Sequence, residues 1–143
     1  MQDGVTTARF DLRSDERFQS LRRDLGVSSF GLNVIVLPPG GRGRIHAHET
    51  QEEVYLVLDG TLSLALEDGE RDLGVGEAAR VAPAVRRQLV NRGPGSCAVL
   101  ALGGAGEHVG RDGLAYASWD ATEPSTPQDL PLPEDLPASE LRT

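Results

Sequence analysis

The chain has 143 residues and a formal net charge of −8, and its shares of hydrophobic (38%) and charged residues (25%) are those of a globular protein. The acidic balance argues against nucleic acid or an anionic membrane as a partner. All 14 basic residues are arginine, which excludes a Schiff-base lysine and a usual P-loop, and the single Cys97 excludes an intramolecular disulfide. With no membrane-length apolar stretch and no signal-peptide pattern, we expect a cytoplasmic protein.

An amphipathic helix is predicted first, over residues 14–25. Ser14 is a suitable N-cap, and Gly26 is suited to end the helix in a left-handed turn. The apolar side chains recur at intervals of three and four residues: Phe18, Leu21 and Leu25. We therefore expect one apolar stripe that docks on a larger body.

Short apolar runs separated by turn residues dominate the next part of the chain. The runs cover residues 30–37, 54–58, 62–66, 78–82, 88–90 and 98–102. Runs this short with such frequent turns predict an antiparallel sandwich or barrel rather than alternating strands and helices. Asp59-Gly60 and Asp68-Gly69 predict hairpin turns, and the alternating leucines of 62–66 predict a strand with one apolar face.

A proline-rich acidic tail follows the strands. Five of the nine prolines lie between Pro124 and Pro137. From Asp120 onward the sequence has six acidic residues and one basic residue, Arg142, so this segment carries −5 of the net charge of −8. Its composition is compatible with disorder or with an extended segment whose leucines lie on the barrel or on a partner subunit. We divide the chain into an N-terminal arm and helix, a barrel and a C-terminal extension: residues 1–26, 27–105 and 106–143.

Two histidines and a glutamate form the first candidate site. His46 and His48 occupy alternate positions of a predicted strand, so both imidazoles leave the same face, and Glu53 begins the next apolar run. Two imidazoles and one carboxylate are a sufficient ligand set for a divalent transition metal, with positions left open for water or substrate. On these residues alone, surface histidines without a metal are an equal alternative.

The spacing of these residues resembles the first signature motif of the cupin superfamily. Gly40, His46, His48, Glu53 and Gly60 fit the pattern Gly-x5-His-x-His-x4-Glu-x6-Gly at every position. The resemblance implies a small β-barrel of the jelly-roll type. It also implies that both histidines and Glu53 stand at three of the family's four metal-ligand positions.

The second cupin motif is degenerate. Gly76 and Asn91 match its ends, and its distance from the first motif is similar to that in small prokaryotic cupins, but Arg87 stands where the fourth ligand would be a histidine. A guanidinium cannot lose its proton to become a ligand. Three arrangements remain open: metal retained with Arg87 turned away or holding an anion, no metal with Arg87 paired to Glu53, or Arg87 in solvent.

Weaker candidates surround this set. Tyr55 shares the strand parity of Glu53 and is expected inside the barrel, as packing or as a pocket hydroxyl, and Gln51 has the parity to reach the cavity. His108 lies beyond the last run and could fold back as a replacement ligand. Cys97 is expected to be a small core residue.

The resemblance spans enzymes and binding modules, so fold alone does not choose the function. The first hypothesis is a metal-dependent cupin, with iron, manganese, zinc or nickel, that performs dioxygenase- or isomerase-like chemistry on a small anionic molecule. The alternative is a metal-free, non-catalytic module that binds a small ligand with Arg87 as anion anchor. Because residues 34–37 are apolar on both strand faces, we expect a homodimer to which the helix or the tail contributes.

Overall fold

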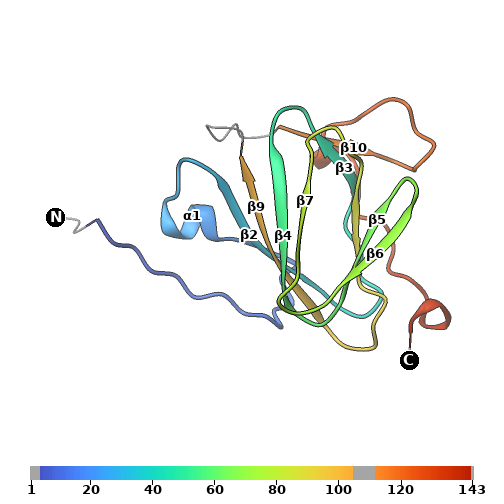
Figure 1. Ribbon diagram of the computed structural model, residues 1–143, viewed down its shortest axis with the longest axis horizontal. Helices are drawn as coiled ribbons and strands as arrows, with labels where there is room; N and C mark the ends of the chain where they lie inside the picture. The colour runs from blue at the N-terminus through green and yellow to red at the C-terminus, as the bar shows by residue number, and fades with distance from the viewer. Residues whose placement is uncertain (1–3, 105–111, 143) are drawn as a thin grey trace.

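The computed structural model describes residues 4–104 and 112–142 and shows β-sheets that enclose one core (Figure 1). A five-stranded sheet has the order β1-β2-β9-β4-β7, a three-stranded sheet the order β6-β5-β8, and a two-stranded sheet pairs β10 with β3. All named pairs are antiparallel, so the prediction of an all-β barrel is confirmed.

The elements in chain order are β1 (Phe18–Ser20), α1 (Leu21–Leu25), β2 (Gly31–Leu37), β3 (Ile45–His48), β4 (Glu52–Asp59), β5 (Leu62–Leu66), β6 (Gly69–Leu73), β7 (Ala78–Val81), β8 (Gln88–Val90), β9 (Cys97–Gly104), β10 (Gly113–Tyr116), and the 3-10 turns η1 (Pro127–Asp129) and η2 (Ala138–Glu140). No helix among the described residues has the length and apolar character needed to cross a membrane.

The core lies between the five-stranded and three-stranded sheets. Side chains that alternate along β4 and β9 meet leucines from the opposite layer, and all are buried: Tyr55, Val57, Cys97, Val99, Leu62, Leu64 and Leu89. Tyr55 is the one aromatic residue of this cluster, and its phenol shares the interior with the fully buried Arg87. The prediction that Cys97 is a core residue is confirmed.

The outer face of the five-stranded sheet carries a second apolar cluster. Val34, Val36 and Ala98 are buried there beneath Leu21 of α1 and other residues of the N-terminal segment. Strand β2 is therefore apolar on both faces, as its sequence indicates, and part of its outer face is covered by the chain itself. Whether the protein forms a dimer stays a prediction.

The predicted helix over residues 14–25 is wrong in its extent. Helix α1 begins only after Ser20, whose hydroxyl accepts from the Arg23 N–H, while Phe18 pairs with Ile35 at the edge of the sheet and is 55% exposed. Strand pairing with β2 gives residues 18–20 backbone partners that an amphipathic stripe in the sequence does not reveal. The expected left-handed C-cap is confirmed, with φ 75° at Gly26.

One of the two predicted hairpin turns is wrong. Asp59-Gly60 joins β4 to β5, which belong to different sheets, whereas β5 and β6 form a hairpin beside Asp68-Gly69. Gly60 has φ 72°, and a Cβ there would lie 2.4 Å from the Ser96 carbonyl oxygen, so the turn requires glycine. The expected apolar face of β5 is confirmed, because Leu62 and Leu64 lie in the core, and the opposite face is also buried at Ser63 and Ala65.

The C-terminal tail lies along the barrel (Figure 1). Main-chain bonds join it to the body, with Leu136 N–H donating to the Gly40 carbonyl at 2.8 Å and Arg142 N–H to the Arg92 carbonyl at 2.7 Å. Arginines of the body hold other tail residues: Arg17 to the Asp135 carboxylate, Arg42 to the Glu134 carbonyl and Arg44 to the Leu130 carbonyl. Of the two alternatives open from composition, the structure shows docking.

Candidate metal centre

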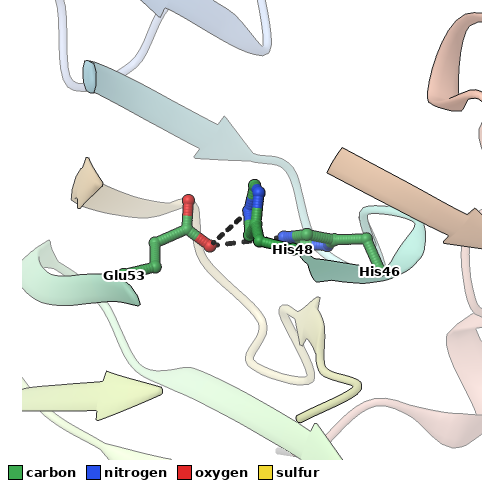
Figure 2. A group of neighbouring side chains, drawn as sticks. All are labelled: His46, His48 and Glu53. Carbon is green, nitrogen blue, oxygen red and sulfur yellow. Dashed lines mark hydrogen bonds and ion pairs between the residues drawn. The ribbon is translucent and has the colours of Figure 1, made fainter. Parts of the chain in front are cut away.

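Strands β3 and β4 bring the predicted ligand set together. His46 and His48 leave the same face of β3, which is held between β10 and an isolated bridge that joins His46 to Arg87. Glu53 points inward from the start of β4, and Figure 2 shows its carboxylate directed at both imidazoles. The three side chains are 22%, 15% and 14% exposed, so the group is sheltered and still accessible.

The distances within this group suit a shared metal ion. The Nε2 atoms of His46 and His48 lie 3.3 and 3.4 Å from the same Glu53 oxygen, Oε1. All three candidate ligand atoms fall within 4.8 Å of one another. Two atoms bound to one zinc ion at about 2.0–2.1 Å in tetrahedral geometry lie about 3.3–3.4 Å apart, which matches the two observed separations.

The hydrogen bonding of His46 leaves a lone pair aimed at the carboxylate. Its Nδ1 lies 3.2 Å from the Arg44 carbonyl oxygen, which can only accept, so Nδ1 carries the proton of the neutral ring. Nε2 is then an acceptor that faces Glu53 Oε1 at 3.3 Å. Two acceptors at this distance call for a cation or an extra proton between them, so the arrangement fits a metal ligand.

His48 carries the second sign of a ligand site. Both of its ring nitrogens are buried and lack a hydrogen-bond partner, although Nε2 lies 3.4 Å from Glu53 and Nδ1 lies 3.9 Å from Asp112 Oδ2. Buried polar atoms without partners are rare in folded proteins, and a metal ion would satisfy such an imidazole nitrogen. The donor set therefore fits a divalent metal.

Asp112 is a site residue that the sequence analysis missed. Its carboxylate accepts from the Thr50 N–H and hydroxyl and from the Gln51 N–H, and so it fixes the turn between His48 and Glu53. Burial raises its pKa, but these hydrogen bonds and the nearby His48 outweigh that effect and lower it. Asp112 lies more than 60 residues from Thr50 in sequence, and no motif position marks it.

Glu53 Oε1 is the point at which the polar contacts of the barrel interior converge. The Tyr55 hydroxyl donates a short hydrogen bond to it, and Arg87 Nη2 donates at 3.1 Å. Burial raises the pKa of Glu53, but its close approach to the imidazoles of His46 and His48 and the hydrogen bond from Tyr55 outweigh burial, so the net shift is downward and the group is ionised. Burial and the charge of Glu53 raise the pKa of Tyr55, so the phenol keeps its proton.

Arg87 lies inside the barrel, fully buried. Besides Glu53, it donates from Nη1 to the Val85 carbonyl at 2.6 Å and from Nε to the Tyr55 hydroxyl at 3.3 Å. The alternative that placed it in solvent is wrong; Arg86 turns away instead and stacks on Tyr116 at 3.7 Å. The contact with Glu53 is the pairing expected for a metal-free pocket. It is present together with the separations of 3.3 and 3.4 Å within the ligand set.

Of the remaining candidates, Gln51 lies near the site and His108 is not described by the structure. Gln51 is buried, and a Cβ built on Gly103 would lie 3.2 Å from its amide oxygen and 4.0 Å from Glu53 Oε2. Gln51 therefore approaches the site beside Gly103, a glycine whose role the sequence analysis missed because its neighbours come from another strand. His108 lies outside the described residues.

Comparisons with known proteins agree with this architecture. The sequence model of the cupin domain matches residues 33–103. A cupin protein from Bacteroides fragilis aligns with a TM-score of 0.66 at 17% identity, over 85% of this chain and 98% of that one. A sugar phosphate isomerase of the cupin superfamily from Silicibacter pomeroyi aligns with a TM-score of 0.62 at 22% identity, over 98% and 97%.

A third solved structure is more distant. An oxalate oxidase in complex with the substrate analogue glycolate aligns with a TM-score of 0.54 at 14% identity, over 70% of this chain and 57% of that one. A search of curated proteins found no match to the sequence. The matched domain and the shared fold show that this chain belongs to the cupin superfamily.

Proposed function

We propose that this protein is a metal-dependent cupin that binds one divalent transition metal through His46, His48 and Glu53 and acts on a small anionic molecule. The observation that carries the proposal is the convergence of both Nε2 atoms on Glu53 Oε1 while Nδ1 of His46 is engaged by a carbonyl. Iron, manganese, zinc and nickel are all compatible with two imidazoles and a carboxylate. Such an ion supplies a Lewis acid for isomerase-like chemistry or, as iron or manganese, a site for dioxygenase-like chemistry.

An anionic ligand follows from the charges inside the barrel. Glu53 and Arg87 cancel each other, so a divalent ion would leave its surroundings positive. At an effective dielectric near 20, a unit charge about 5 Å from a divalent ion is repelled by several kcal/mol, and an anion relieves this repulsion. Two solved structures with the same fold are named for anionic molecules, a sugar phosphate and oxalate, which supports the same class of ligand.

The chain's own residues would divide the work at the centre. His46 would present the lone pair of Nε2 and His48 a ring nitrogen without a hydrogen-bond partner, and the Tyr55 hydroxyl steadies the Glu53 carboxylate by donating to Oε1. Gln51 brings a side-chain amide beside the same carboxylate, where it could contact a bound molecule. Ligand-binding roles for Gln51, Tyr55 and Arg87 are part of this proposal.

Metal analysis tests the proposal directly. Protein purified without chelators is expected to hold about one equivalent of metal, and His48→Ala is expected to lose it while the fold survives, since His48 is a strand residue at an open site. Glu52→Gln is the matched control, because Glu52 is the neighbouring carboxylate on β4 and pairs with Arg80 at the surface. Full metal retention by His48→Ala would contradict the ligand assignment.

A metal-free binding module is the second candidate function, favoured by the buried ion pair between Arg87 and Glu53 at 3.1 Å. Its weakness lies in the contacts of the guanidinium: Nε and Nη1 already donate to Tyr55 and to the Val85 carbonyl, which leaves little of the fork for a bidentate grip. Isothermal titration with zinc, manganese, iron(II) and nickel separates the two candidates. Absence of binding for all four would favour the metal-free module.

We also propose a homodimer, on the strength of the outer face of the five-stranded sheet. Beside the part that the N-terminal segment covers, this face carries the paired row Leu32, Leu102 and Val54. Leu102 and Val54 line an open depression of about 620 Å³. Phe10 and Phe18 of the N-terminal segment are 43% and 55% exposed. Aliphatic and aromatic surface of this kind is typical of an interface. Light scattering at micromolar concentration should give twice the chain mass, and a monomer would contradict the proposal.

A further inference from the structure

We infer that Arg87 makes metal binding at this centre depend on an anion, so that the divalent metal and an anionic ligand bind as a pair. This inference rests on the proposed metal-binding function, which it deepens by assigning a regulatory role to the residue that departs from the cupin motif.

The first support is that the positive charge of Arg87 cannot leave the centre. The side chain is fully buried, and its Nη2 lies 3.1 Å from the same Glu53 oxygen on which both imidazoles converge. Nη1 and Nε are held by the Val85 carbonyl and the Tyr55 hydroxyl. Moving the guanidinium away would take this partner from the buried Tyr55 hydroxyl and from the sheltered Glu53 carboxylate, so the charge is a permanent part of the site.

The second support is the balance of charges around the ligand set. Among the described residues, the ionised groups in contact with it are Glu53 and Arg87, with Asp112 beyond His48. Asp112 is occupied by three donors from Thr50 and Gln51. Arg87 therefore cancels the one carboxylate that would ligate the metal, and a divalent ion alone would leave a positive site.

The third support is that the candidate ligands are partly exposed to solvent and that Arg87 keeps a donor for the anion. Three protein ligands leave coordination positions open, and the histidines and Glu53 are partly exposed. Nη2 carries two N–H groups, and the described residues supply it with one acceptor, Glu53 Oε1. One donor of Arg87 is thus left for an anion, which would also restore neutrality around the metal.

The test measures zinc affinity by competition with a chromophoric chelator, with and without glycolate, and uses glycolamide as the neutral analogue of the same shape. For the wild-type protein we expect glycolate to tighten zinc binding at least tenfold and glycolamide to leave it unchanged. Coupling is reciprocal, so zinc should tighten glycolate binding by the same factor in isothermal titration. Equal zinc affinity with and without glycolate would overturn the inference.

Variants separate the role of Arg87 from general electrostatics. Arg87→Gln should bind zinc at least tenfold more tightly than wild type without glycolate and should lose most of the glycolate dependence, whereas Arg87→Lys should keep that dependence. Arg86→Gln, which removes the adjacent charge outside the barrel, should behave as wild type. An unchanged Arg87→Gln would overturn the inference even if zinc binds.

Two further results keep this inference distinct from the proposed function. If neither wild type nor any folded variant binds zinc, with or without glycolate, the metal site itself is refuted. His48→Ala serves as the blank, because any glycolate effect that persists in it comes from zinc in solution. Circular dichroism checks that each variant is folded, and if Arg87→Gln is not, the wild-type response to glycolate still decides the inference.

Discussion

Replacing Arg87 by alanine should destabilise the metal-free protein strongly. The side chain is fully buried and is paired with Glu53, which is 14% exposed. Removing one partner of a buried ion pair leaves the other charge uncompensated and costs about 3–5 kcal/mol. In a domain of this size 1 kcal/mol corresponds to about 3 °C in the melting temperature, so we expect a loss of about 9–15 °C.

Thermal unfolding followed by circular dichroism in the presence of a chelator measures this loss. Arg80→Ala is the matched control, because Arg80 of β7 pairs with Glu52, the residue next to Glu53 on β4, and their side chains are 61% and 52% exposed. An exposed pair of this kind contributes about 0–1 kcal/mol, and its loss should move the melting temperature by no more than about 3 °C.

A double variant gives the reasoning its sharpest test. Arg87→Ala combined with Glu53→Gln should be less destabilised than the sum of the single changes, because the charge left unpaired by the first change is removed by the second. The reasoning is refuted by an Arg87→Ala protein that melts no lower than the Arg80→Ala control, or by fully additive effects of the two changes in the core.

Three further predictions concern the rest of the molecule. Gly60→Ala should lower the melting temperature by several degrees, because the new Cβ would lie 2.4 Å from the Ser96 carbonyl at φ 72°. Burial raises the pKa of the Cys97 thiol to about 12, so iodoacetamide should label it only after unfolding, and rapid labelling of the native protein would contradict its placement. Burial raises the pKa of Asp72, but hydrogen bonds, including that from Arg142, outweigh it and lower the pKa. The contribution of ionised Asp72 to the free energy of unfolding is therefore present above its unfolded pKa and lost as pH falls through its folded pKa. Urea titrations should show the free energies of unfolding of wild type and Asp72→Asn converging in acid. A difference that stays constant with pH would contradict this prediction.

Much of the fold was predictable from local pattern. Short apolar runs between turn residues specify strands without any knowledge of what they contact, and all six predicted runs overlap strands to within two residues at each end. The run 54–58 begins two residues late, because its strand starts with the two acidic residues Glu52 and Glu53. Strands β1, β6 and β10 lie outside the predicted runs. Strand β1 falls within the predicted helix, and β6 is largely exposed and carries three charged residues.

The convergence of the candidate metal ligands was also predictable. The alternation of side chains along a strand puts His46 and His48 on one face, and the spacing to Glu53 matches a known motif, so short-range geometry was sufficient. Tyr55 and Gln51 followed from the same parity. Their roles toward a ligand remain predictions.

The surroundings of the site depended on contacts that link distant parts of the chain. Only the packed barrel shows that Arg87 faces inward and Arg86 outward, because a bridge to His46 sets the orientation of that strand. Asp112 directly precedes β10 and reaches the turn after His48 because β10 pairs with β3, and the acidic tail docks where body arginines meet its carbonyls. Residue type and spacing determine local structure and the ligand set, whereas the partners of a buried charge are selected by three-dimensional packing, which has no counterpart in the linear pattern.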